Sequence, residues 1–144
     1  MFMGKYNHTI DPKGRLSIPA KYREKLGDEF VVASGIDGCL FVYANDDWEA
    51  LFEQIKTYPT LTDEEIRELK RYLYTGAQPV TVDKQGRILL TQDMREAAGL
   101  EKDVVLAGVG DYIEIWDEER WKAKRATMDI QKITRNLSAA GIRI

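Results

Sequence analysis

The stretch Ile10-Asp11-Pro12-Lys13-Gly14-Arg15-Leu16 decides the fold, because it returns later as Val82-Asp83-Lys84-Gln85-Gly86-Arg87-Ile88. The two segments align at an offset of 72 residues, and seven of the nineteen positions from Thr9 to Gly27 carry the same residue in the second copy. Self-similarity at a fixed offset indicates a duplicated structural unit. The chain is therefore expected to consist of two copies of one unit.

Most residues of the repeated stretch have turn chemistry. Asp11 at the first position, Pro12 at the second and Gly14 at the fourth match a type I turn, in which Asp accepts the following amides and Gly tolerates positive φ. Asp83 and Gly86 occupy the same positions in the second copy. We expect each turn to close a tight hairpin between the strands that flank it.

The remainder of each copy predicts a short helix and a strand pair. Alternation in Leu16-Ser17-Ile18 is typical of a half-buried strand, Pro19 suits a first helical position, and Gly27 suits a helix end. In the second copy Thr91 is the expected helix cap. Short apolar runs then predict strands at residues 30–33, 39–43, 104–107 and 112–116.

An acidic helical segment separates the copies. Apolar residues at i, i+3, i+4 and i+7 from Trp48 predict a first helix, capped by Asp46 or Asp47. A capping box that starts at Thr62 predicts a second helix, ending at Gly76. No counterpart of this pair is expected after the second copy. The predicted organisation is a half-domain at residues 5–47, a helical connector at 48–75, a second half-domain at 76–119, and a basic C-terminal helix and tail at 120–144, fraying beyond residue 137.

The size of the chain favours one shared core. A chain of 144 residues with 44% hydrophobic residues buries roughly 70% of its unfolded surface. One copy alone is close to the lower size limit for independent folding, so we expect the copies to share their core. No apolar run approaches the roughly 20 residues of a membrane span, and the N-terminus lacks the order of a signal peptide. We expect a cytoplasmic protein with no membrane partner.

The sequence offers little for metal or enzyme chemistry. Cys39 is the single cysteine and His8 the single histidine, so no disulfide, metal site or cofactor is expected, and Cys39 is predicted to be a buried thiol. No Ser/His/Asp set, phosphate loop or HExxH spacing is present. Carboxylates at residues 63–65 and 117–119 are explained by helix starts. An enzyme is not expected, and hydrolase chemistry from a carboxylate pair would need a cleft.

Charge is distributed unevenly along the chain. The formal net charge is −3, but residues 5–25 carry six basic and two acidic side chains. Residues 120–144 carry seven basic side chains against Asp129 alone, which leaves −13 for residues 26–119. A polyanion would therefore meet local basic patches and no general positive field.

The arginine of the repeated stretch is the residue that turn geometry does not require. Arg15 and Arg87 could simply pair with the aspartates of their own turns. Beside Lys13 and Lys84, however, they are also placed to meet phosphate or a guanine edge, which the planar guanidinium matches bidentately. Since a two-stranded ribbon fits the major groove, DNA binding is the more specific hypothesis.

The residues from His8 to Ala20, together with their second copy, resemble the swapped-hairpin DNA-binding modules of the AbrB type. Two such modules on one chain resemble the MraZ family, bacterial transcriptional regulators of the division and cell-wall gene cluster. The second copy departs from the first in having Lys84-Gln85 for Pro12-Lys13 and in lacking the Ser-x-Pro that follows.

The resemblance implies a β-rich α+β fold in which two tandem swapped-hairpin halves form one pseudo-twofold, interleaved β-barrel with helices after each half. It further implies a nucleoid-associated, ring-shaped homo-oligomer that functions as a repressor by binding direct repeats in double-stranded promoter DNA. The implied sites are the turn residues Asp11, Gly14, Asp83 and Gly86, and the DNA-binding residues Arg15, Lys13, Arg87, Lys84 and Lys5.

An alternative of another class stays open. The hairpins could be purely structural, while the acidic helices with Trp48, Phe52 and Tyr72 form a surface for a protein partner; an AbrB-like antitoxin would combine both roles. Steep salt dependence would mark phosphate contact, whereas docking through aromatic anchors would depend on salt only weakly.

Overall fold

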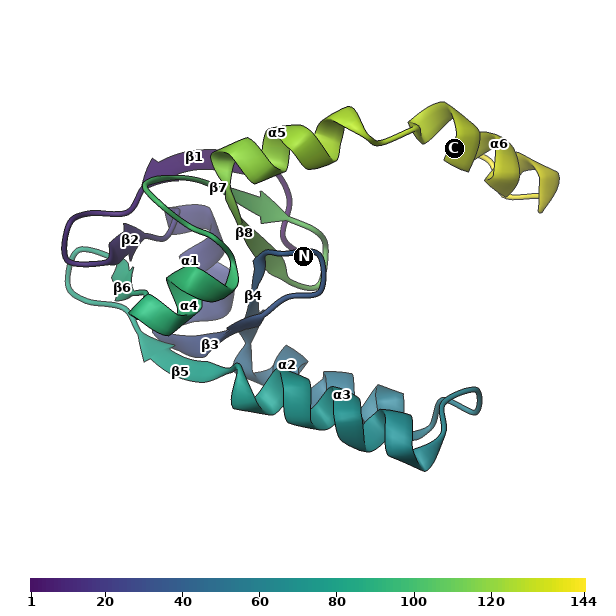
Figure 1. Cartoon of the computed structure of the whole chain (residues 1–144), viewed down its shortest axis with the longest axis horizontal. Helices are drawn as coiled ribbons and strands as arrows, with labels where there is room; N and C mark the ends of the chain where they lie inside the picture. The colour runs from purple at the N-terminus through teal and green to yellow at the C-terminus, as the bar shows by residue number, and fades with distance from the viewer.

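The computed structural model describes residues 1–144 as a mixed α+β fold (Figure 1). A six-stranded antiparallel sheet has the order β1-β7-β8-β4-β3-β5, and a separate two-stranded ribbon pairs β2 with β6. The strands are β1 (Lys5–Thr9), β2 (Arg15–Ser17), β3 (Glu29–Ser34), β4 (Leu40–Ala44), β5 (Gln78–Thr81), β6 (Arg87–Leu89), β7 (Asp103–Gly108) and β8 (Ile113–Asp117). The helices are α1 (Ala20–Leu26), α2 (Asn45–Lys56), α3 (Asp63–Thr75), α4 (Gln92–Ala97), α5 (Glu118–Ala126) and α6 (Ile130–Ala139).

The two copies of the repeat are interleaved through their first strands. Strand β1 pairs with β7 of the second copy, and β5 pairs with β3 of the first. The ribbon likewise takes one strand from each copy, with Leu16 opposite Ile88. Neither copy can therefore complete its hydrogen-bonded sheet alone.

The prediction that each turn closes a hairpin is correct for the turn and wrong for the pairing of the strands that flank it. Both turns form, because the amide of Gly14 donates to Asp11 (2.9 Å) and that of Gly86 donates to Asp83 (3.0 Å). The strands on either side of each turn, however, pair with strands of the other copy. Turn chemistry determines the reversal of the chain, whereas the burial of apolar strand faces determines the partner.

The expected closed barrel is also not formed. Strands β1 and β5 are the two edges of the sheet, and no strand pairing joins them. Pro79 in β5 lacks an N–H for a further ladder, which suits an edge strand. The sheet consequently stays open, with the ribbon lying outside it.

The core is shared between the copies, as predicted. Twenty buried residues from both halves form one cluster, which includes Leu16 and Ile88 of the ribbon. A second cluster of ten buried residues joins the outer side of the sheet to α2 and α3 through Phe52, Leu73 and Trp116. None of the helices is both long and apolar enough to cross a bilayer.

Helices α2 and α3 form an arm that projects from the body (Figure 1). The capping box of α3 is confirmed: Thr62 accepts from the amide of Glu65, and the Glu65 carboxylate accepts from the amide of Thr62. The predicted cap of α2 is wrong, because Ala44 is its N-cap residue. Asp46 and Asp47 instead lie in the first turn, where the helix dipole stabilises them.

The C-terminal region also differs from the expectation, because a second helical pair follows the second copy. Helix α5 packs on the sheet through Trp121, whose ring lies 5.9 Å from that of Trp116. Helix α5 ends at Ala126, and Asp129 caps the next helix, α6, by accepting from the amide of Lys132 (3.0 Å). Helix α6 extends beyond residue 137 and lies away from the body (Figure 1).

Candidate nucleic-acid interface

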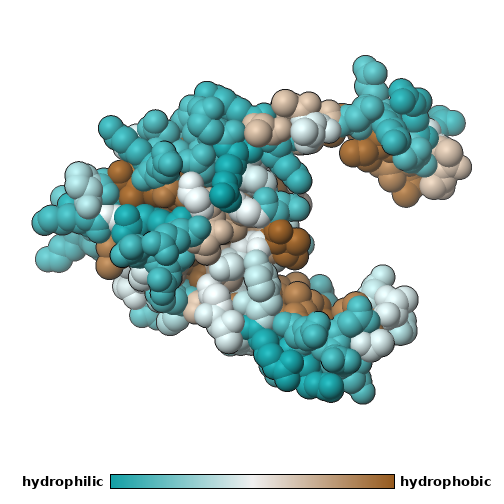
Figure 2. All heavy atoms as spheres, in the orientation of Figure 1, coloured by the Kyte–Doolittle hydropathy of each residue, from teal (hydrophilic) through white to brown (hydrophobic).

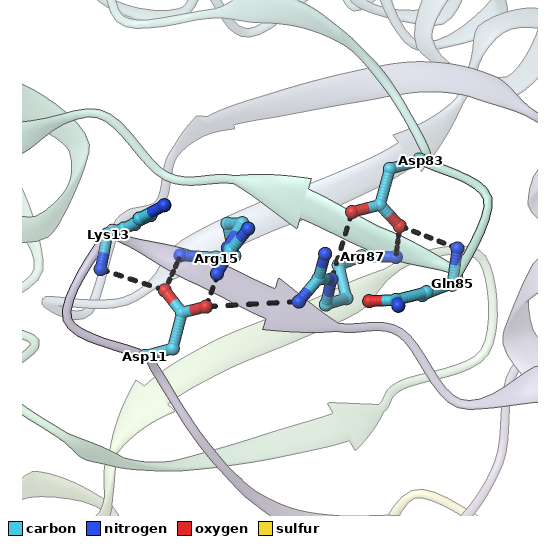
Figure 3. A network of polar contacts seen from close by, with 6 residues as sticks. All are labelled: Asp11, Lys13, Arg15, Asp83, Gln85 and Arg87. Atoms are coloured by element: carbon cyan, nitrogen blue, oxygen red, sulfur yellow. Dashed lines mark hydrogen bonds and ion pairs between the residues drawn. The ribbon is translucent and has the colours of Figure 1, made fainter.

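The ribbon of β2 and β6 places one arginine from each copy on the same outer face. Leu16 and Ile88 face inward and are fully buried, so their neighbours along each strand face outward. Arg87 lies opposite Ser17 and Arg15 opposite Leu89, which puts the two arginines diagonally across the ribbon. The repeat thereby becomes a pair of related cationic groups on a single surface (Figure 3).

The Asp11 carboxylate organises the first turn. Its Oδ1 accepts from the amides of Lys13 and Arg15, both at 2.9 Å. Its Oδ2 accepts from Nε of Arg15 at 2.6 Å. One aspartate therefore holds both the turn backbone and the arginine side chain (Figure 3).

The Asp83 carboxylate repeats this arrangement in the second turn. Oδ1 accepts from the amides of Gln85 and Arg87 at 2.9 Å, and Oδ2 accepts from Nε of Arg87 at 2.9 Å. The backbone amide of Arg15 lowers the pKa of Asp11 below its ordinary value of 3.8, and the amide of Arg87 does the same to the pKa of Asp83. Both carboxylates are consequently ionised at neutral pH.

These contacts show that the predicted Asp–Arg pairing within each turn does occur, but it uses only Nε of each guanidinium. The Nη nitrogens of Arg15 have no hydrogen-bond or ion-pair partner in the protein. Nη1 of Arg87 is 4.0 Å from Oδ2 of Asp11, a weak contact between the copies. Each aspartate thus orients an arginine while leaving its terminal nitrogens available to another molecule.

Both turns are also held by the other copy. The amide of Leu90 donates to the carbonyl of Gly14 (2.8 Å), and the amide of Ile18 donates to the carbonyl of Gly86 (3.0 Å). Gly14 has φ +85° and Gly86 has φ +77°, a backbone conformation that disfavours any side chain. The turns are therefore a rigid part of the shared fold.

Arg23 and Arg95 also belong to this region, although no functional role was predicted for them. Nε of Arg23 donates to the carbonyl of Ile18 (3.0 Å), and its guanidinium lies against Gly86. Arg95 lies beside Gly14, and its Nε is buried without a partner. The signal was present, since both arginines are among the seven matching positions, but a helix surface explained them equally well.

The predicted lysines do not all lie together. Lys13 and Lys84 are exposed at the tips of the two turns. Lys5 is at the opposite end of β1 from the Asp11 turn, in a cleft of about 450 Å³ that Trp121 and Arg125 of α5 also line. Lys13 and Lys84 therefore accompany the arginines, and Lys5 belongs to a different part of the surface.

Cys39 is a buried thiol, as predicted. It is 2% exposed, and burial, reinforced by the neighbouring Glu114 carboxylate, raises the pKa of its thiol to about 12. No group of three or more His, Cys, Asp or Glu side chains is arranged to hold a metal ion.

Comparison with known proteins agrees with the duplicated architecture. The family model described as "MraZ protein, putative antitoxin-like" matches residues 1–71 and residues 73–138, two stretches whose starts are one repeat offset apart. The chain belongs to the MraZ family. Its MraZ relatives include proteins named transcriptional regulator MraZ from Lachnoclostridium phytofermentans and Acetivibrio thermocellus. The first is 53% identical over 85% of this chain and 86% of the relative, and the second is 42% identical over 99% and 100%.

Proposed function

We propose that this protein is a transcriptional regulator that binds double-stranded DNA sequence-specifically through the β2–β6 ribbon. The observation that carries the proposal is the outward pair of Arg15 and Arg87, each fixed through Nε by its own aspartate. An arginine oriented before binding loses less side-chain entropy when it meets its target. The names of the MraZ relatives, which are called transcriptional regulators, support the same class of function.

The chemistry of the ribbon suits a DNA groove. A two-stranded ribbon enters the major groove, and an arginine there pairs bidentately with the O6 and N7 acceptors of guanine. Lys13 and Lys84 at the turn tips are exposed and are suited to phosphate oxygens. In this proposal the arginines read sequence, and the lysines position the protein on the backbone.

The family resemblance supports the finer parts of the proposal. Each chain would be a pseudo-twofold pair of AbrB-type swapped-hairpin modules, and several chains would form a ring on direct repeats in the promoter of the division and cell-wall gene cluster. There the protein would act as a nucleoid-associated repressor. Multivalency would offset the net charge of −3, because linked subunits on repeated sites gain effective concentration.

The test is DNA binding by arginine variants on the upstream region of the protein's own operon. Arg15→Ala combined with Arg87→Ala is expected to abolish specific retention in a gel shift, with thermal unfolding measured alongside to show that the fold persists. Lys122→Ala, on the exposed face of α5, is the matched control and should bind as wild type does. Wild-type affinity of the double variant would refute the proposed interface.

A second candidate, docking of a protein partner as in an antitoxin, is favoured by one observation. The α2–α3 arm carries a groove lined in part by Phe52, Ile66 and Tyr74. Salt separates the two functions: DNA retention through phosphates should fall steeply on a log–log plot against salt concentration, whereas docking on the arm should change little.

A further inference from the structure

A cleft of about 290 Å³ lies between the start of helix α2 and the loop that joins β7 to β8, away from the ribbon. Asp47 lines it from α2 and Asp111 lines it from the loop, and neither carboxylate forms an ion pair within the chain. The loop is closed by a hydrogen bond from the amide of Val109 to the carbonyl of Tyr112 (3.0 Å). Two unpaired carboxylates therefore border one cleft from two ordered elements.

Tyr43 in β4 forms the buried wall of this cleft. It is 6% exposed, and its ring stacks on that of Tyr112, with centroids 5.0 Å apart and an interplanar angle of 13°. Its hydroxyl has no hydrogen-bond partner in the protein, yet it is not sealed in the interior, where Nε of Arg95 is the sole buried side-chain nitrogen or oxygen without a partner. The hydroxyl of Tyr43 thus opens on the cleft with lone pairs free to accept a hydrogen bond.

The electrostatic potential in the cleft is negative. Burial is the main cause that raises the pKa of Tyr43, and the carboxylates of Asp111 and Asp47 raise it further, since negative groups disfavour a phenolate. The same carboxylates act on the Met1 α-amino group: Lys25 lowers its pKa, whereas Asp47 and Asp111 oppose that change. A free hydroxyl acceptor, aromatic rings and two carboxylates together favour a cationic ligand.

We propose that this cleft binds a short aliphatic diammonium cation, with one ammonium group at each carboxylate. The Tyr43 hydroxyl accepts a hydrogen bond from one ammonium group, and the methylene chain lies against Ala50 and Leu51 in the lining. Two charges on the ligand match the two aspartates, one on each side of the cleft. The bound cation links the base of the α2–α3 arm to the body.

An organic cation suits the cleft better than a metal ion does. Mg²⁺ and Ca²⁺ take about six or more oxygen ligands, and no group of three or more His, Cys, Asp or Glu side chains is arranged here to supply them. Aromatic rings, by contrast, attract ammonium groups and pack against methylene carbons. Figure 2 shows the α2–α3 arm as mostly hydrophilic, with its apolar atoms toward the open gap, which suits a water-soluble ligand at its base.

The test is isothermal titration calorimetry of the full chain with putrescine at low salt and without DNA. Wild type should bind in a saturable manner, and Asp47→Asn combined with Asp111→Asn should weaken binding by at least about tenfold. Tyr43→Phe, which removes only the hydroxyl, should weaken it by roughly 3–10-fold. Asp46→Asn with Asp63→Asn removes two carboxylates from helix starts outside the cleft and should bind as wild type does. Putrescine should also raise the thermal midpoint of wild type and of this control, but not that of the Asp47/Asp111 variant.

Other outcomes overturn the inference. No saturable binding to wild type would exclude the site, and an equal loss in the control variant would indicate general charge attraction. Butylamine carries a single ammonium group, and if it bound as tightly as putrescine, the two-point geometry would be wrong. Aspartate-dependent binding of Mg²⁺, or of a lysine peptide, without binding of putrescine would assign the cleft to a metal or to a protein partner instead. Because no DNA is present, failure of this titration leaves the proposed function standing, and loss of DNA binding in the arginine variants leaves this inference standing.

Discussion

The Asp11 turn and the Asp83 turn share one backbone arrangement, but they differ in what surrounds it. Each aspartate accepts from two amides and from Nε of the arginine that follows four residues later. Between aspartate and glycine the residues are Pro12-Lys13 in one turn and Lys84-Gln85 in the other. The comparison indicates that the fold requires the Asp–Gly–Arg geometry twice, while the charge at each turn tip can vary.

The largest difference between the two turns is expected in the loss of stability when their glycines are replaced. A Cβ at Gly14 would lie 2.9 Å from the carbonyl oxygen of Leu90, which is fixed backbone, whereas a Cβ at Gly86 would meet the Arg23 guanidinium, a flexible group. Both positions have positive φ, which alone costs about 1–2 kcal/mol for alanine. We expect Gly14→Ala to lower the free energy of unfolding by about 2–4 kcal/mol and Gly86→Ala by about 1–2 kcal/mol.

Urea unfolding of both glycine variants measures this difference. Gly110→Ala is the control, since its φ is +91° but its Cβ would meet nothing within 4 Å. Gly86→Ala should resemble this control, and equal losses for Gly14→Ala and Gly110→Ala would contradict the steric argument.

The next largest difference is expected between the contributions of the two arginines to specific DNA binding. The side chain of Arg15 is 34% exposed with free Nη nitrogens, whereas that of Arg87 is 25% exposed and its Nη1 approaches Asp11. We expect Arg15→Ala to weaken specific DNA binding by roughly 1–3 kcal/mol per contacting site and Arg87→Ala by less. Fluorescence anisotropy on operator and scrambled DNA measures both. Arg15→Lys tests bidentate recognition, because it keeps the charge but not the planar fork.

The lysines at the turn tips should have smaller and less specific effects. Lys13→Ala and Lys84→Ala should each weaken binding to all sequences alike and reduce the slope of log affinity against log salt by about 0.9. Conversely, Gln85→Lys gives the second turn the basic residue that the first turn carries at this position and should raise the slope by a similar amount. Salt titrations on operator DNA provide the measurement, and a change in base preference would contradict a phosphate role.

Lowering the pH should have the smallest effect on stability, because the turns are solvent-exposed. The folded-state pKa values of Asp11 and Asp83 lie below the ordinary value of 3.8, so the unfolded chain binds more protons as the pH falls. The stabilisation is present above about pH 4 and is lost as the pH falls through the lower folded-state values. Urea midpoints between pH 5 and 2.5 should therefore decline less steeply for Asp11→Asn combined with Asp83→Asn than for wild type.

Local signals in the sequence predicted the turns, the short helices and the shared core correctly. They could not predict the strand partners, since the Asp11 turn has the same chemistry whether β2 returns to β1 or crosses to β6. The Asp–Arg pairing was foreseen, whereas the positions of Arg23 and Arg95 against the glycines of the opposite turns depend on the interleaving.

Helix α6 was missed for a different reason. Ile130, Ile133 and Leu137 already have helical spacing in the sequence, and Asp129 is an ordinary cap. The narrow apolar face is masked in the sequence by the high basic charge of residues 120–144. A weakly apolar helix gains little within one chain, so only its place in the structure shows that it lacks a partner.

The exchange of strands between the copies has a consequence for synthesis. Lys5 in β1 pairs with Ala107 in β7, so β1 has no partner strand until β7 has been synthesised. At translation rates of about 5–20 residues per second, the roughly 100 residues between these two strands take about 5–20 s to make. Such non-local pairing is intrinsically slow to form and exposes the nascent chain to aggregation. The first copy therefore cannot fold as a unit ahead of the second, and the two copies reach the native state together.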